Sequence, residues 1–259
     1  RQECLAALRD AMMNGSVDPD LLTEIGNMID ETWGNETTMV RFRSSSNAED
    51  ALSFSGAGLY DSTSACLADQ RDGDTAGESL CDSDQDEERD IERAVRVVWS
   101  SLWNMGAYEE RDWYGIDHSL SMMGILVNTR SKDEQVNMVV FSGDPIAADD
   151  RILVNAQQGE HDVVSGEPGL TPEVVRLAIT DGSVSEITRE AYSSISDNTW
   201  LLSRDQLEEL GSAMANVETV FPVDEDARSD QPILLDTEWK VLSDGRIIIK
   251  QVRPFLRQE

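Results

Sequence analysis

The chain has 259 residues, enough for one large domain or two small ones. Its net charge of −30 predicts no nucleic-acid partner, because proteins of that class present a basic patch. No apolar run approaches the roughly 20 residues that a membrane-spanning helix needs, so no membrane span is expected.

Two helices are predicted at the start of the chain. Leu5, Leu8 and Met12 recur at helical spacing. Asp18 followed by Pro19 is typical of a helix start, with the aspartate as N-cap and the proline in the first turn. Apolar residues at helical spacing follow in residues 21–29, which extends the second helix.

A strand that leads into a glycine loop is predicted for residues 38–62, TMVRFRSSSNAEDALSFSGAGLYDS. The strand carries Arg41 and Arg43, and the loop contains Gly56 and Gly58. Guanidinium groups match phosphate oxygens, and glycines let backbone N–H groups approach closely, so this stretch can hold an anion such as phosphate. A surface loop rich in turn-forming residues is an equally open alternative.

The cysteines suggest a cross-link. Cys66 and Cys81 flank a stretch rich in glycine and aspartate, and a disulfide that closes this loop would suit an exported protein. Two free surface thiols are the alternative, and Cys4 is left without a partner.

The clearest helix covers residues 91–103, where apolar residues follow i, i+3, i+4 spacing. Asp82, Asp84 and Asp86 alternate before it, as ligands of a calcium loop would. No glycine follows at the turn position and no acidic residue stands where the bidentate ligand belongs, so the solvated start of an acidic helix is favoured.

Strands are predicted next at residues 121–128, 136–141 and 152–156, separated by turn-forming residues. A further short strand is predicted at 163–166, and other short strands between 168 and 198. Ser203 is expected to cap a helix that continues to Val217.

A closing β-hairpin is predicted at residues 233–242 and 246–252, around Asp244-Gly245. A two-residue type I′ loop would place four pairs on one face: Leu242 with Ile247, Lys240 with Ile249, Glu238 with Gln251, and Asp236 with Arg253. This face could be solvent-exposed without a function. Alternatively, its carboxylates bind Mg²⁺ beside an arginine that binds phosphate, as in a nucleoside triphosphate site.

Together these motifs resemble the nucleotide-binding domain of phosphoenolpyruvate synthase, pyruvate phosphate dikinase, rifampicin phosphotransferase and the glucan, water dikinases, which share an ATP-grasp fold. Seven blocks occur in the family's order between about residues 38 and 254. Residues 40–50 resemble VRSSAxxED, residues 56–62 the glycine loop, 94–111 the helix xxVWASLFTxRAxxYR, 125–128 VLVQ, 141–145 FTRNP, 159–166 GLGExVVSG, and 235–254 the closing MDIEW and LQARP.

The resemblance implies an α+β, ATP-grasp-like fold with helices packed on antiparallel or mixed sheets and a closing hairpin. It implies a partial N-terminal subdomain over residues 1–118, lacking the family's first portion, and a C-terminal subdomain over residues 119–259. It also implies an enzyme domain that binds ATP and Mg²⁺ and transfers a phosphoryl group to a histidine on a separate domain, in another segment or chain.

The resemblance also assigns roles to individual residues. Arg43 and Arg253 are the catalytic residues: Arg43 contacts the ATP phosphates, and Arg253 stabilises the transferring phosphoryl group. Glu238, Gln251 and Asp236 hold Mg²⁺ and the triphosphate. The remaining nucleotide contacts implied by the motifs are Ser44, Gly56, Gly58 and, at the adenine-linker position, Asn128.

The sequence also departs from the family. Nothing corresponds to the GGKG segment whose lysine binds phosphate, and Gly106 stands where the RAxxYR helix has its first arginine, although Arg111 matches the later one. His118 and His161 do not lie in a phosphohistidine motif, and each is interpreted as structural or exposed.

These departures favour an alternative, namely a degenerate, inactive nucleotide-binding or structural module of an exported protein. A third interpretation is an exported interaction domain whose acidic loop binds calcium. Localisation stays open, because a disulfide would indicate export or the periplasm, whereas the family resemblance indicates the cytoplasm.

Overall fold

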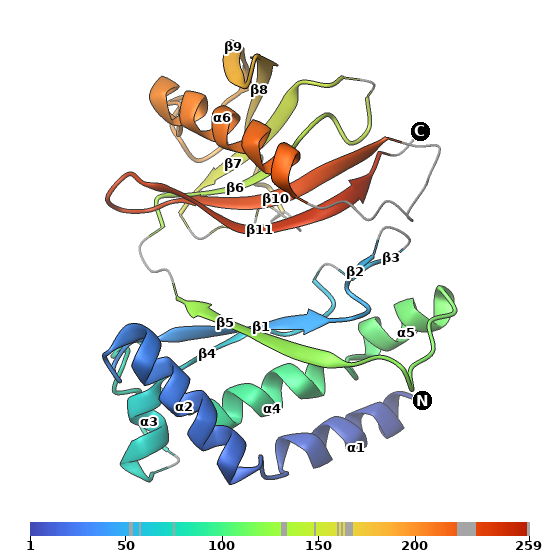
Figure 1. Ribbon diagram of the computed structural model, residues 1–259, viewed down its shortest axis with the longest axis vertical. Helices are drawn as coiled ribbons and strands as arrows, with labels where there is room; N and C mark the ends of the chain where they lie inside the picture. Colours follow the sequence, from blue (N-terminus) through green and yellow to red (C-terminus); the bar gives the residue numbers. More distant parts are fainter. Residues whose placement is uncertain are drawn as a thin grey trace. The chain divides into compact units, whose positions relative to one another are not determined.

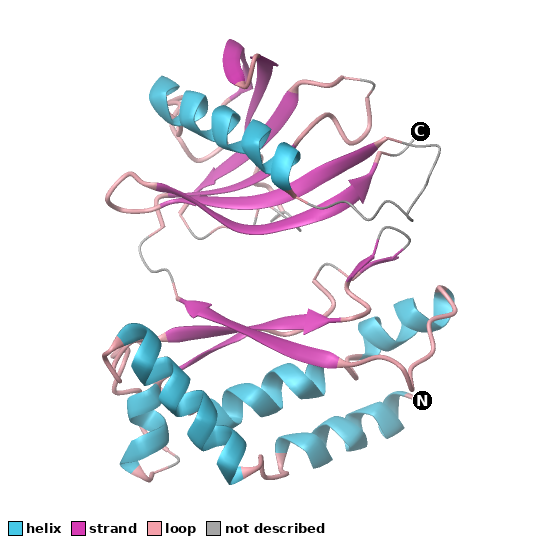
Figure 2. Cartoon of the chain, in the orientation of Figure 1, coloured by secondary structure: helices cyan, strands magenta, loops and turns pink. Residues whose placement is uncertain are grey.

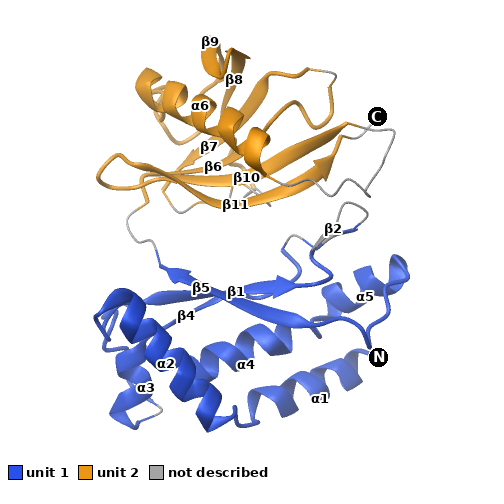
Figure 3. Ribbon diagram, viewed as in Figure 1, with its two compact units in different colours: residues 1–130 blue, residues 131–259 orange. Residues whose placement is uncertain are grey.

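The structure is a computed structural model that describes residues 1–51, 54–56, 58–74, 76–130, 134–147, 149–159, 161, 163, 168–221 and 232–257. The chain divides into two compact units, residues 1–130 and 131–259 (Figure 3). The first unit runs past the boundary expected after residue 118, because strand β5, Met123–Thr129, pairs with strand β1, Val40–Ser46. No helix in the described part of the chain is long and apolar enough to cross a membrane.

The first unit packs helices against one face of a three-stranded antiparallel sheet of order β4-β1-β5 (Figures 1 and 2). A two-stranded ribbon, β2-β3, follows β1. The other elements are α1 (Gln2–Met13), α2 (Pro19–Trp33), β2 (Asp50–Ala51), β3 (Phe54–Ser55), β4 (Thr63–Ala65), α3 (Leu67–Asp72), α4 (Ile91–Ser101) and α5 (Met105–Trp113).

Alternation along β1 creates the core of the first unit. Val40 and Phe42 are fully buried and pack in one cluster with Val95 and Val98 of α4. Because side chains alternate along a strand, the residues between and after them point to the opposite face of the sheet. The predicted start of α2 is confirmed, since the Asp18 side chain accepts the backbone N–H of Asp20 with proline at the first helical position.

The helix that the resemblance implies over residues 94–111 is broken in two. Helix α4 ends at Ser101, and α5 begins at Met105 after a short turn. The helix predicted at residues 91–103 is thus found as α4, and the part of the motif that contains Arg111 lies on a separate helix. Asn104 at the N-cap of α5 donates its side-chain amide to the Leu59 carbonyl oxygen at 3.1 Å, which ties this turn to the loop after β3.

The predicted disulfide between Cys66 and Cys81 is confirmed, with Cα atoms 5.9 Å apart, and Cys4 is free and exposed.

The prediction that Asp82, Asp84 and Asp86 form the solvated start of a helix was wrong. Asp82 is 4% exposed, and its carboxylate lies 2.5 Å from the Arg130 guanidinium. Helix α4 begins only at Ile91, capped by Asp90.

The second unit packs helix α6 on one face of a six-stranded antiparallel sheet of order β11-β10-β6-β7-β8-β9. Ser203 caps α6 in a capping box with Gln206, as expected. Of the short strand predicted at 163–166, only Val163 lies within the described residues, and residues 168–198 form two long strands. The elements are β6 (Val136–Phe141), β7 (Ile152–Gln158), β8 (Glu173–Thr180), β9 (Ser183–Ala191), α6 (Arg204–Val220), β10 (Ile233–Val241) and β11 (Ile247–Leu256). The predicted α+β fold with antiparallel sheets and a C-terminal hairpin is confirmed.

The register of the closing hairpin differs from the prediction near the turn. Leu242 pairs with Arg246 around a three-residue loop that contains Gly245 at φ +83°, so Lys240 lies opposite Ile248 rather than Ile249. A three-residue loop of this kind is the next most common hairpin connection after the two-residue turn. Beyond the turn, Lys250 is bulged out of the pairing and shifts the register by one residue. Both outer pairs, Glu238 with Gln251 and Asp236 with Arg253, are therefore found as predicted.

Candidate functional site

In the second unit, polar side chains gather on the sheet face opposite α6. Leu235, Trp239 and Val241 of β10 belong to the apolar cluster that includes α6. Asp236 and Glu238 alternate with them and therefore point to the other face. The hairpin pairs add Arg253 and Gln251 on β11, so two carboxylates, an amide and a guanidinium share one small area of the sheet.

Two ion pairs, one buried and one partly exposed, hold these side chains in place. Nε and Nη2 of Arg253 each lie 2.7 Å from Oδ2 of Asp236, with Asp236 5% and Arg253 9% exposed. Nζ of Lys250 lies 3.4 Å from Oε2 of Glu238. Lys250 was missed by the sequence analysis, because it reaches Glu238 only through a bulge that no local pattern reveals.

The donor set of this area suits magnesium and phosphate. Carboxylate and amide oxygens from Asp236, Glu238 and Gln251 are hard donors of the type that Mg²⁺ prefers. Arg253 presents its planar group of N–H donors beside them, which matches phosphate oxygens. The arrangement can therefore bind a magnesium–polyphosphate ligand.

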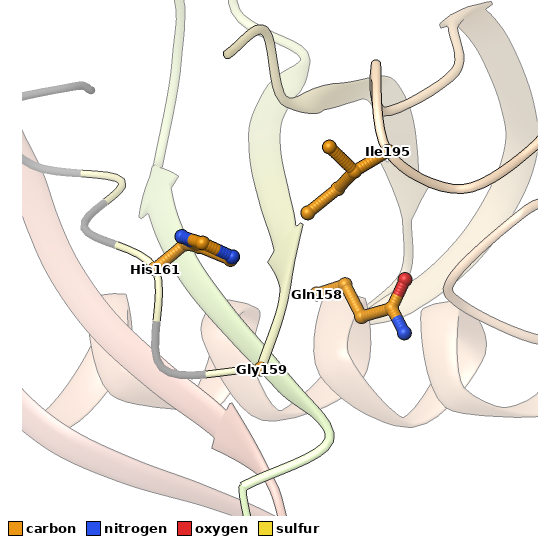
Figure 4. A pocket seen from close by; sticks show the side chains of 4 residues that line it. All are labelled: Gln158, Gly159, His161 and Ile195. Carbon is orange, nitrogen blue, oxygen red and sulfur yellow. The ribbon is translucent and has the colours of Figure 1, made fainter. Parts of the chain in front are cut away.

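A cavity of about 520 Å³ lies at the end of β7, within the size range of ligand pockets (Figure 4). It is lined by Gln158, Gly159, His161 and Ile195. Gly159 has φ +68°, a left-handed conformation that favours glycine, and its carbonyl accepts the Asn137 side-chain amide at 2.8 Å. Gly159, the first residue of the 159–166 block matched to the family motif, thus borders a pocket, although residues 160, 162 and 164–166 lie outside the described residues.

In the first unit, arginines line the sheet face opposite α4. Arg41 and Arg43 alternate with the buried Val40 and Phe42, and Arg41 pairs with Asn128 of β5. Nε of Arg43 and Oδ1 of Asn128 are buried and have no hydrogen-bond partner among the described residues. Unsatisfied buried polar atoms of this kind indicate a missing ligand or water.

The charges on this face also favour an anion. Burial lowers the pKa of Arg41, and the positive charges of Arg43, Arg130 and Arg89 lower it further. Guanidinium groups that repel each other are stabilised when an anion binds among them. The sequence predicted both arginines as candidate anion ligands, whereas the family resemblance assigned a role to Arg43 alone; the two-residue spacing puts both on one face.

The loop after β1 is held by glycine and glutamate. The Gly56 N–H donates to the Glu49 carbonyl at 2.5 Å, and a Cβ on Gly56 would lie 2.9 Å from Cα of Glu49. Only glycine permits this approach. The Ser44 hydroxyl donates to Glu49 at 3.3 Å, and Gly58 takes a left-handed φ of +75°. Gly56 and Ser44 thus already have protein partners, and Ala57 lies outside the described residues.

A buried arginine, Arg111, supports this loop. Arg111 is fully buried and donates to the Tyr60 hydroxyl at 3.1 Å, to the Leu102 carbonyl at 2.6 Å and to Nδ1 of His118 at 3.3 Å. Tyr60 in turn donates to the Ala48 carbonyl at 2.9 Å. Only the family motif marked Arg111, and it did not show that the side chain is internal.

Comparison with known proteins relates the chain to a nucleotide-binding family. Residues 2–259 match the family described as the AMP/ATP-binding domain of pyruvate phosphate dikinase. A phosphoenolpyruvate synthase of Aeropyrum pernix is 25% identical over 205 residues, which cover 75% of this chain and 24% of that protein. The chain thus spans about a quarter of the length of that relative. Because the family match covers nearly every residue, the chain belongs to the pyruvate phosphate dikinase AMP/ATP-binding domain family.

Proposed function

We propose that this ATP-binding domain holds MgATP and serves a dikinase-type phosphoryl transfer to a histidine on a separate domain. The observation that carries the proposal is the pairing of Glu238 with Gln251 and of Asp236 with Arg253 on one sheet face. The three-residue loop shifts the register of β11 by one residue, and the bulge at Lys250 shifts it back, so these two pairs form. If Lys250 instead took a paired position opposite Glu238, every later residue of β11 would shift by one, and Arg253 would no longer lie opposite Asp236.

In this proposal Glu238, Gln251 and Asp236 bind Mg²⁺, because their side-chain oxygens are the type of ligand that Mg²⁺ prefers. When bound, Mg²⁺ would neutralise charge on the phosphate oxygens during transfer. Lys250 beside Glu238 restrains that carboxylate. The Asp236–Arg253 ion pair fixes the guanidinium, so its remaining N–H donors are pre-organised for a phosphoryl group.

The first unit supplies further nucleotide contacts in this proposal. Arg43 and Asn128 are the best-supported nucleotide contacts, because each has a buried polar atom without a partner among the described residues. Ser44, Gly56 and Gly58 are weaker assignments, because Ser44 and Gly56 already bond to Glu49. We therefore expect Arg43 to contribute more to affinity than Ser44.

Calorimetric titration with MgATP tests the proposal. Arg43→Met, Glu238→Gln and Arg253→Met should each weaken binding at least about tenfold, since a charge-assisted contact contributes about 1.5–3 kcal/mol. Arg246→Met is the matched control, because Arg246 lies in the same hairpin but its side chain is 72% exposed and pairs only with Asp244 in the described structure. Wild-type protein that fails to bind MgATP, or site variants that bind like Arg246→Met, would refute the assignment.

Gly106 supports a second candidate, ATP binding without turnover. It stands where the family helix carries an arginine, and a Cβ there would meet only Cδ2 of Leu59, at 3.8 Å. The position is thus open to a longer side chain. In this case the wild type binds MgATP but does not phosphorylate an added phosphohistidine domain, and Gly106→Arg tightens MgATP binding while Gly106→Ala does not. Phosphorylation by the wild type would exclude this candidate.

A further inference from the structure

An acidic cluster lies between α3 and the start of α4, outside the sheet faces described above. One carboxylate oxygen from each of Asp69, Asp72 and Glu88 lies within 4.8 Å of the others. The disulfide from Cys66 to Cys81 closes the segment that carries Asp69 and Asp72, and Glu88 follows it in the chain. Three carboxylates at this separation repel one another unless a cation or protons compensate for their charge.

Glu88 is the residue that points to a ligand. Only 6% of it is exposed, and its Oε2 atom is buried without a hydrogen-bond partner among the described residues. Buried carboxylates are normally paired, hydrogen-bonded or bound to a metal ion. Within the described chain, the Glu88 carboxyl group forms no ion pair with a basic side chain; its side-chain hydrogen bond is to another acidic residue, Asp74, and it lies against the carboxylates of Asp69 and Asp72.

No arginine or lysine of the described residues forms an ion pair with these three carboxylates. The nearby Arg71 is engaged by Asp30 and Glu36 instead. The Arg89 guanidinium donates to the Gln85 side chain at 2.5 Å. The cluster is therefore not balanced by a basic side chain within the part of the chain that the structure describes.

Asp69 is held in position by the backbone. It is 1% exposed, and its two oxygens accept the N–H groups of Leu80 at 2.8 Å and Arg89 at 2.9 Å. Each of these oxygens keeps a second lone pair for another partner. The cluster thus combines one fixed carboxylate, one buried carboxylate and the exposed Asp72.

We propose that Asp69, Asp72 and Glu88 bind one calcium ion. Calcium takes oxygen ligands at about 2.3–2.6 Å, so two oxygens on the same ion are at most about 5 Å apart, and this cluster meets that limit. Calcium also accepts the irregular geometry of a loop, with water or backbone carbonyls as additional ligands, better than magnesium does. The ion would join α3 to the segment before α4, beside the disulfide, and it is independent of nucleotide binding.

Terbium luminescence and calorimetric calcium titration of EDTA-treated protein, in about 0.15 M salt to screen the general negative charge, test the proposal. We expect one ion per chain and a melting temperature that rises with calcium and less with magnesium. Glu88→Gln and Asp72→Asn should each weaken calcium binding at least tenfold. Asp84→Asn and Glu87→Gln, exposed carboxylates of the same loop outside the cluster, should leave it unchanged.

The variants also separate a metal site from a purely structural cluster. Glu88→Gln should raise the melting temperature of the calcium-free protein, because it removes a buried charge, and should abolish the response to calcium. Asp72 is exposed, so its variant is expected to fold and keeps the test informative if Glu88→Gln does not. Absence of calcium binding, or equal losses in the cluster variants and the two controls, would overturn the proposal.

Discussion

Arg111 shows how a single side chain supports the glycine loop of the first unit. Its guanidinium is fully buried and contacts Tyr60, the Leu102 carbonyl and His118, and it lies 5.8 Å from the centre of the Trp103 ring. None of these partners is a carboxylate. The charge is stabilised by hydrogen bonds and by the aromatic face, which together connect the loop to α4 and α5.

Arg111→Met should reduce the free energy of unfolding by about 3 kcal/mol, because it leaves the Tyr60 hydroxyl and the Leu102 carbonyl buried without their donor. Urea denaturation measures this loss. Arg204→Met is the control, since Arg204 is 77% exposed and its ion pair with Glu208 contributes less than about 1 kcal/mol. Equal losses in the two variants would show that Arg111 does not support the loop.

Glu88 makes stability depend on pH in the calcium-free protein. Burial, followed by the charges of Asp69, Asp74 and Asp72, raises the pKa of Glu88 to about 7. A carboxyl whose pKa is raised on folding favours the native state while it is protonated. Its contribution is complete below the unfolded pKa of 4.5 and is lost as the pH rises through about 7.

We therefore expect the stability difference between Glu88→Gln and the wild type to grow in favour of the variant from about pH 5 to pH 8. Chemical denaturation at a series of pH values in EDTA measures this difference. Comparison with the wild type removes the contribution of the other acidic residues, which both proteins share. A difference that does not change with pH would show that Glu88 is ionised throughout this range.

Among the elements, the closing hairpin depends on two irregularities that offset each other. The three-residue loop shifts the pairing by one residue, and the bulged Lys250 shifts it back. Between them lies a short regular section in which Trp239 pairs with Ile249. Gln251 and Arg253 therefore share the face opposite α6 with Asp236 and Glu238, whereas a one-residue slip of β11 would turn them to the other face.

Deletion of Lys250 tests this account of the hairpin. Removing the bulged residue leaves Gln251 opposite Glu238 and Arg253 opposite Asp236 in a continuous ladder, so the protein should still unfold cooperatively. Deletion of Val252 is the matched change, because it moves Arg253 opposite Thr237 and turns a charge toward the α6 core. We expect that deletion to cost more than about 4 kcal/mol in unfolding free energy, measured by urea denaturation. Equal effects would refute the bulge assignment.

At the level of the whole chain, local signals predicted most elements. Asp18-Pro19 and Ser203 marked helix starts, and Asp244-Gly245 marked the hairpin, because capping and turn chemistry act over a few residues. Cysteine spacing around a polar loop predicted the disulfide. The motif order predicted the family, since a series of short motifs is specific even where each alone is weak.

Other features could not be predicted because they depend on tertiary contacts. The break between α4 and α5 carries no proline and is fixed by Asn104, which bonds to the distant Leu59. The bulge at Lys250 and the burial of Arg111 leave no periodic trace in the sequence. The outer hairpin pairs were predicted from a turn that the structure does not contain, and they were right only through a compensating shift.

The location of the metal in the nucleotide complex tests the central claim most directly. Crystals of the protein with a non-hydrolysable ATP analogue and Mn²⁺ in place of Mg²⁺ give an anomalous peak at the ion. We predict this peak within coordination distance, on the order of 2 Å, of a Glu238 carboxylate oxygen, with Arg253 on a phosphate of the analogue. A nucleotide-bound ion that contacts none of Asp236, Glu238 and Gln251 would contradict the proposed site.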